Sequence, residues 1–225
     1  MRSRRHRGSE VLQLDERTLA RSLSASLGLE VRLAIACEPL APPALSAGEA
    51  AAFRDVAGTP RSQSWLRGRA ALRRLRSALR EDPDTAALRL PHRTQSLTHG
   101  GGLSVAFGVG GDGAASVAGT GVDMELAAGP SSETARLFLT ASERRWLSAL
   151  PEAARPAQLL RLWTEKEALY KANPANRHTA LVDYLLAHPE RPAGTASVRG
   201  APGAPLRYAT VPFLGGCLTA AVLRR

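Results

Sequence analysis

The 225-residue sequence contains little cysteine, little lysine and few aromatic residues. Its two cysteines, Cys37 and Cys217, are too few for a disulfide framework or a structural zinc site. We therefore expect both to be buried apolar residues of a cytoplasmic protein. No apolar run approaches the roughly eighteen residues that a membrane helix needs. The arginine-rich residues 1–8 are followed by no apolar signal core, so we expect neither secretion nor membrane association.

Lysine is scarce although the chain is strongly basic. The formal net charge is +10, from 30 basic and 20 acidic residues, which suits a nucleic acid, a membrane surface or an acidic protein as partner. Only Lys166 and Lys171 are lysines, and they lie in one six-residue stretch. Lysine can lose its proton when its surroundings lower its pKa, whereas arginine cannot. The pair therefore indicates that these two positions require an amine rather than a guanidinium. Two lysines left by chance on a solvated helix face remain an alternative.

The aromatic content, 4%, bears on the choice of partner. The high isoelectric point and the arginine-rich stretch at 64–80 suggest a nucleic-acid-binding protein. Such proteins usually place aromatic side chains among the basic ones. Here the aromatics fall mostly at the spacing of core residues, so we expect no nucleic-acid partner.

Hydrophobic periodicity and turn residues predict an α+β chain. Capping boxes at Ser46/Glu49 and Thr140/Glu143 are expected to open helices. The expected helices are 46–56, 64–80, 132–137, 141–150 and 156–172, and the expected strands are 29–37, 95–98, 103–109, 114–126 and 216–223, with 99–102 as a turn. These elements form two comparable halves, 29–118 and 119–225, after a basic and flexible extension, 1–28.

Two carboxylates stand out in the segment GVDMEL. Asp123 and Glu125 are two residues apart on an expected strand, so both side chains leave the same face. Held together they repel each other unless a cation lies between them, and hard oxygen ligands favour Mg²⁺ or Mn²⁺ over zinc. Taken alone, the pair also fits ordinary surface carboxylates.

A second group of polar residues lies on the expected helix at 156–172. In WTEKEALYK, Trp163, Glu167 and Lys171 are four residues apart and form one stripe. A carboxylate and an amine on one stripe suit metal binding, proton abstraction and stabilisation of a leaving group. Alternatively, Glu167 and Lys171 form an ordinary solvated ion pair on the helix surface.

Taken together, GVDME and WTEKEALYK resemble the signature of 4′-phosphopantetheinyl transferases. That signature is G-[IV]-D-x-E, then about forty residues, then W-x-x-K-E-[AS]-x-x-K, and both lysines fall on its lysine positions. SLTH (96–99) resembles the segment before the first motif in the larger, Sfp-type members. PRSQSWLRGR (60–69) and FLTASERRWL (138–147) resemble two further family segments, so that the resemblance covers about residues 54–225.

The resemblance implies a fold and an activity. The fold is one chain with two similar α/β subdomains in a pseudo-dimeric arrangement, acting as a monomer with its active site in the cleft between them. The activity is Mg²⁺-dependent transfer of phosphopantetheine from coenzyme A to a serine of an acidic acyl or peptidyl carrier protein. Carriers of fatty-acid, polyketide and nonribosomal-peptide synthesis all remain open.

The resemblance also implies residue roles. Asp123, Glu125 and Glu167 would bind Mg²⁺ against the pyrophosphate of coenzyme A, and Glu167 would accept the proton of the carrier serine. Lys171 would neutralise or protonate the leaving phosphate. The coenzyme A contacts would come from Arg61, Arg69, Thr98, His99, Asp123 and Lys171. Two segments depart from the family pattern: RLPHR (89–93) replaces its G-K-P loop, and 171–184 replaces its K-x-x-G-x-G-L.

Three rival functions remain open at this point. The carboxylates would equally serve another metal-dependent phosphoryl or nucleotidyl transferase. A basic nucleic-acid-binding protein is disfavoured by the placement of its aromatics. A catalytically inactive carrier-binding homologue is disfavoured by the intact acidic and lysine positions.

Overall fold

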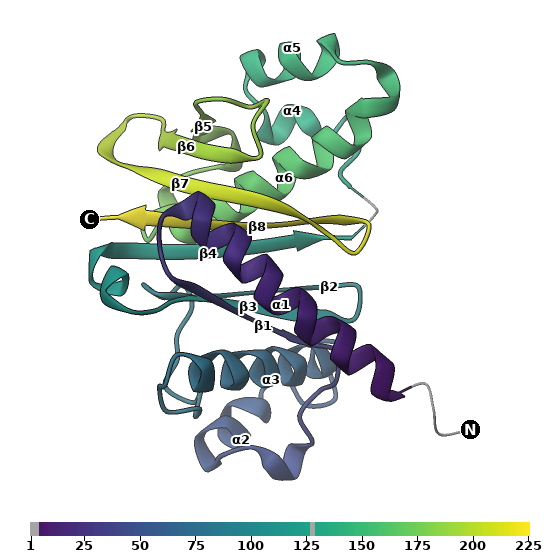
Figure 1. Cartoon of the computed structure of the whole chain (residues 1–225), viewed down its shortest axis with the longest axis vertical. Helices are drawn as coiled ribbons and strands as arrows, with labels where there is room; N and C mark the ends of the chain where they lie inside the picture. The colour runs from purple at the N-terminus through teal and green to yellow at the C-terminus, as the bar shows by residue number, and fades with distance from the viewer. Residues whose placement is uncertain (1–4, 127–128) are drawn as a thin grey trace.

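The computed structural model describes residues 5–126 and 129–225 (Figure 1). The α-helices are α1 (Arg5–Leu27), α2 (Ala47–Phe53), α3 (Ser62–Ala78), α4 (Ala135–Phe138), α5 (Ala141–Ala149) and α6 (Arg155–Ala172). The strands are β1 (Val31–Ala36), β2 (Gln95–Gly100), β3 (Leu103–Val109), β4 (Val117–Glu125), β5 (Tyr184–Leu186), β6 (Ala193–Val198), β7 (Ala201–Phe213) and β8 (Gly216–Arg224). The mixture of helix and sheet confirms the α+β class. None of the described helices is long and apolar enough to cross a membrane.

The strands form two antiparallel sheets, one of three strands in the order β1-β3-β2 and one of five in the order β4-β8-β7-β6-β5. The two sheets meet where β2 lies beside β4: the backbone N–H of Val122 donates to Ser96 Oγ at 3.0 Å. They enclose a shared core that includes Val105, Phe107 and Leu218. Helix α3 covers the other face of the small sheet, and α6 covers the large one (Figure 1). A pseudo-dimeric relation between the two halves stays a prediction.

The N-terminal segment is a packed helix over its described side chains. Leu23 and Leu27 of α1 are 0% exposed and belong to the shared core. The helix ends at Leu27, and the next residue, Gly28, has φ 64° and donates its N–H to Ser24 O at 2.9 Å. The expectation of a flexible extension over 1–28 is therefore wrong for residues 16–28, because apolar residues at helical spacing fasten α1 across both sheets (Figure 1).

Both predicted capping boxes are confirmed. The hydroxyls of Ser46 and Thr140 each accept from the N–H of the glutamate three residues on, and that glutamate accepts from the cap N–H in return. Helix α2 ends at Phe53, three residues before the expected end, and turn residues 54–58 follow it.

Two other expectations are corrected by the structure. Residues 99 and 100 continue β2 rather than turning, so that only Gly101 and Gly102 form the turn, at φ 55° and 78°. Cys217 is buried as expected, but Cys37 lies exposed just beyond β1.

Candidate active site

Helix α6 lies directly on one face of β4. A Cβ on Gly121 would lie 1.9 Å from Ala168 O, and a Cβ on Gly119 would lie 2.1 Å from Ala172 O. Only glycine permits so close an approach of two backbones. Because side chains alternate along a strand, Asp123 and Glu125 share this face with the glycines. Helix and strand run in opposite directions, which aligns the stripe of α6 with the two carboxylates of β4.

Three side chains, each from a different element, meet at this contact. Lys171 Nζ of α6 lies 2.7 Å from Asp123 Oδ1 of β4, and it also donates to Val122 O at 3.3 Å. Thr98 Oγ1 of β2 donates to the same Asp123 Oδ1 at 3.2 Å. The structure therefore brings Thr98, Asp123 and Lys171 together at the junction of the two sheets.

Trp163 fixes the second carboxylate. Its Nε1 donates to Glu125 Oε1 at 3.1 Å. Its ring also packs edge-on against Phe138, with centroids 5.0 Å apart. The sequence predicts Trp163 on one stripe with Glu167 and Lys171 but predicts no partner for its indole. The spacing of the stripe was the available signal, and only the tertiary structure shows which carboxylate the indole reaches.

One oxygen of this cluster has no partner. Asp123 is 6% exposed, and its buried Oδ2 accepts no hydrogen bond. A buried carboxylate oxygen left unpaired is costly, so such an atom indicates a ligand site. Lys171 and Thr98 occupy Oδ1 and leave Oδ2 available to a cation.

The pKa values of the neighbouring carboxylates are raised. Burial raises the pKa of Glu125, and the charge of Asp123 adds to it, whereas the Trp163 hydrogen bond and Lys171 act in the opposite direction. Burial also raises the pKa of Glu167, and the charges of Asp123 and Glu125 add to it, against the effect of Lys171. The three carboxylates thus lie within each other's electrostatic field. A bound cation would relieve their repulsion.

The residues present fit a magnesium ion that takes two carboxylates from the protein and its other ligands from substrate and water. Nowhere in 5–126 or 129–225 do three or more His, Cys, Asp or Glu side chains form a group arranged to hold a metal. Mg²⁺ in phosphoryl-transfer sites, however, is usually held by one or two carboxylates, with substrate phosphates and water completing the shell. Asp123 Oδ2 and Glu125 meet that requirement, while the three-ligand set with Glu167 stays a prediction.

The other lysine has a structural role. Lys166 is 0% exposed, and its Nζ donates to both carboxylate oxygens of Glu143, at 2.7 and 2.9 Å, and to Tyr184 O. Three donors on a compact ammonium match three acceptors in a buried space, which a planar guanidinium would not fit. The solvated-face alternative is therefore wrong for Lys166.

The predicted coenzyme A contacts lie on the small sheet and its helix. Arg61 is the cap residue before α3, and His99 is exposed on β2. Because α3 runs antiparallel to β2, Arg61 lies toward the end of β2 that carries His99. Arg69 stacks on Trp65 at 4.6 Å and donates to Thr85 O at 3.2 Å. Among the described residues, no hydrogen bond or ion pair joins Arg61, Arg69 or His99 to Asp123. Their contacts with coenzyme A stay predictions.

A buried acid that the sequence did not single out lies on the same helix. Glu165 is 0% exposed and accepts at Oε1 from Arg161 (2.6 Å) and Thr210 (3.0 Å), while its Oε2 has no partner. Burial raises its pKa from the ordinary 4.5 to about 7, against the effect of Arg161. The spacing of Arg161 and Glu165 indicates a surface ion pair, and only the sheet packed over them makes it a buried one.

A comparison with protein families gives a match over part of the chain that includes this site. Residues 119–209 match the family model described as the 4′-phosphopantetheinyl transferase superfamily. The match covers somewhat less than half of the chain and shows that this segment is similar to that superfamily. The matched segment includes β4 from Gly119 onward and all of α6, and hence Asp123, Glu125, Glu167 and Lys171. No curated protein matches the chain in a sequence comparison.

The phosphopantetheinyl transferase match confirms the resemblance at the level of the superfamily. It supports a transferase that acts with coenzyme A and a carrier protein. Arg61, Arg69, Thr98 and His99 precede the matched residues, so the Sfp-type assignment, which depends on them, stays a prediction.

Proposed function

We propose that this protein transfers 4′-phosphopantetheine from coenzyme A to a serine of an apo carrier protein, releasing adenosine 3′,5′-bisphosphate. The observation that carries the proposal is the Lys171–Asp123 contact, which places an amine beside a buried carboxylate whose second oxygen is free. The contact lies within the segment that matches the superfamily.

In this proposal, Asp123 Oδ2 and Glu125 hold Mg²⁺, with Glu167 as a further ligand. The ion, when bound, would neutralise charge on the pyrophosphate of coenzyme A. Thr98 orients the Asp123 carboxylate through its hydroxyl, and Trp163 orients that of Glu125. Two fixed donors thus hold the ligands in place before any substrate arrives.

The transfer itself is an in-line displacement. The hydroxyl oxygen of the carrier serine attacks the phosphorus that bears the pantetheine, and its proton passes to Glu167, directly or through water. The bond from that phosphorus to the bridging oxygen breaks, and the electron pair leaves with adenosine 3′,5′-bisphosphate. Lys171 stabilises or protonates the leaving phosphate. The position of Glu167 on α6, four residues before Lys171 on the same stripe, supports its role as the base.

The remaining assignments extend this proposal. Arg61, Arg69 and His99 read the phosphates of coenzyme A from the small-sheet side, and an acidic carrier is drawn in by the basic surface. The protein acts as a cytoplasmic monomer on carriers of polyketide, nonribosomal-peptide or fatty-acid synthesis.

Incubation with coenzyme A and an apo carrier protein tests the function. Mass spectrometry should show phosphopantetheine added to the carrier with Mg²⁺ or Mn²⁺, and no addition after EDTA treatment. Asp123→Asn should lower the rate about a hundredfold or more while the exposed Asp112→Asn retains it. A panel of carriers that stay unmodified by the wild-type protein would overturn the proposal.

A further inference from the structure

A row of polar side chains crosses the large sheet beneath α6. Asp123 of β4 is in register with Thr219 of β8, and Thr219 is in register with Thr210 of β7. Directly opposed residues of antiparallel strands direct their side chains to the same face, so all three lie on the face that α6 covers. Thr219 is 0% exposed. The row therefore leads from a candidate metal ligand into the interior of the protein.

Hydrogen bonds at the inner end of the row fix the direction of each hydroxyl. Glu165 Oε1 of α6 accepts from Arg161 at 2.6 Å and from Thr210 Oγ1 at 3.0 Å. The hydroxyl oxygens of Thr210 and Thr219 are 2.8 Å apart. A threonine hydroxyl has one proton, and Thr210 gives its proton to Glu165, so Thr219 has to donate to Thr210. Thr219 can then only accept a further hydrogen bond.

The outer end of the row pairs two groups that both lack a proton to give. Asp123 Oδ2 is buried and has no hydrogen-bond partner among the described residues. Thr219, its neighbour across the strands, has its own proton committed to Thr210. Two acceptors side by side are stabilised by a cation and its water. Mg²⁺ keeps several waters when it binds to proteins, and a water whose lone pair binds the ion has only protons left to offer.

We propose that Thr219 is a positioning residue of the metal site, whose hydroxyl oxygen accepts a hydrogen bond from a water of the Mg²⁺ shell. Thr210 and Glu165 set the orientation of that hydroxyl. The inference rests on the proposed function only in that Asp123 binds the ion. Partners of this kind, one step removed from the metal, commonly determine its affinity. Thr210 and Thr219 both follow the residues that match the superfamily, so the match assigns them no role.

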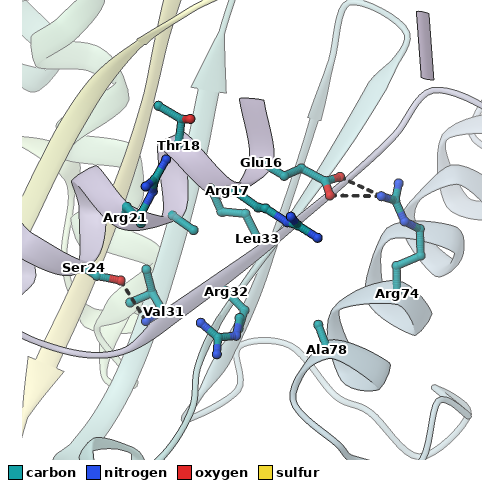
Figure 2. A pocket seen from close by; sticks show the side chains of 11 residues that line it. Glu16, Arg17, Thr18, Arg21, Ser24, Val31, Arg32, Leu33, Arg74 and Ala78 are labelled. Atoms are coloured by element: carbon teal, nitrogen blue, oxygen red, sulfur yellow. Dashed lines mark hydrogen bonds and ion pairs between the residues drawn. The ribbon is translucent and has the colours of Figure 1, made fainter. Parts of the chain in front are cut away.

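Unpaired buried oxygens distinguish this row from the rest of the surface. A groove of about 1090 Å³ lies elsewhere, between α1, β1 and α3 (Figure 2). Its acidic residue, Glu16, is already held by Arg74 at 2.9 and 3.0 Å. None of the residues that line the groove has a buried side-chain atom without a partner, whereas Asp123 and Glu165, at the two ends of the row, each have one. The unmet hydrogen bonds therefore indicate a ligand beneath α6.

Metal affinity tests the proposal without any turnover. Mn²⁺ is the probe, and electron paramagnetic resonance measures the free ion with coenzyme A present and no carrier, corrected for the Mn²⁺ that coenzyme A binds alone. Thr219→Val should weaken Mn²⁺ binding about tenfold, whereas Thr219→Ser, which keeps the hydroxyl, should stay close to the wild type. Thr120→Val is the matched control: Thr120 is 1% exposed and donates to His92 O at 3.1 Å from the opposite face of β4. It should lose stability but not Mn²⁺ affinity.

Thr210→Val tests the direction of the hydroxyls. It changes no atom beside the metal, but it frees the proton of Thr219 to bind Asp123 Oδ2 in competition with the ion, so Mn²⁺ affinity should fall about twofold to tenfold. Wild-type affinity in Thr210→Val, or equal weakening by Thr219→Val and Thr120→Val, would overturn the proposal. So would wild-type affinity in Thr219→Val while Asp123→Asn loses the ion, and the proposed function would then still stand. If Asp123→Asn binds Mn²⁺ as the wild type does, the metal site and the proposal fail together.

Discussion

Lys171 Nζ lies 2.7 Å from Asp123 Oδ1, whereas Lys166, five residues earlier on the same helix, is directed to Glu143 at 2.7 and 2.9 Å. Lys171 has 31% of its side chain exposed, and Lys166 has none. The two lysines of this arginine-rich chain therefore serve two purposes. Lys166 fastens α5 and β5 to α6, and Lys171 belongs to the candidate active site.

Lys166 should be essential to stability. Lys166→Met leaves the carboxylate of Glu143 buried without a counter-charge, which should lower the free energy of unfolding by about 3–5 kcal/mol in urea denaturation. Adding Glu143→Gln should recover part of that loss, because the uncompensated charge is then removed. If Lys166→Met unfolds at the wild-type urea concentration, the buried pair contributes no net stability.

Glu165 should make stability depend on pH. Its pKa is about 7 in the folded protein and near 4.5 when unfolded, so between these values the folded state keeps a proton that the unfolded state releases. The stabilisation is complete below about pH 4.5 and is lost as pH rises through about 7, by about 3 kcal/mol.

Thermal melts between pH 5 and pH 8 test the Glu165 prediction. Glu165→Gln resembles the protonated form, so its melting temperature should fall less than that of the wild type as pH rises. The exposed Glu152→Gln is the matched control and should follow the wild type. Parallel curves for all three proteins would exclude Glu165 as the source of the pH dependence.

Gly121 should tolerate no side chain. A Cβ at this position would meet Ala168 O at 1.9 Å and would push α6 away from β4. Gly121→Ala should therefore cost about 1–3 kcal/mol or more in stability and should lower transferase activity by separating Lys171 from Asp123. Gly203→Ala, where an added Cβ meets nothing within 4 Å, is the control. Wild-type stability in Gly121→Ala would contradict the close helix–strand contact.

Local patterns predict much of this structure. Hydrogen bonds between near neighbours define both capping boxes, and the alternation of strand side chains puts Asp123 beside Glu125. The stripe of α6 follows from helical spacing alone. Each of these features depends on residues at most eight positions apart.

Features that depend on distant residues could not be predicted in this way. The expectation for α1 gave weight to its arginines, whereas Leu23 and Leu27 become core residues only because two sheets surround them. Likewise, the partners of Trp163 and Lys166 lie 38 and 23 residues away along the chain. The family motif predicts that Arg69 contacts a phosphate, whereas in the fold its guanidinium stacks on the Trp65 ring.

The most direct test of the active-site assignment is the turnover of Lys171→Arg in carrier modification. Arginine keeps the charge but is planar, bulkier and effectively never deprotonated, so it cannot replace a compact amine at the leaving phosphate. We predict that kcat falls about a hundredfold or more, that KM for coenzyme A changes much less, and that the melting temperature stays near that of the wild type. Near-wild-type kcat in Lys171→Arg would contradict the catalytic role of Lys171.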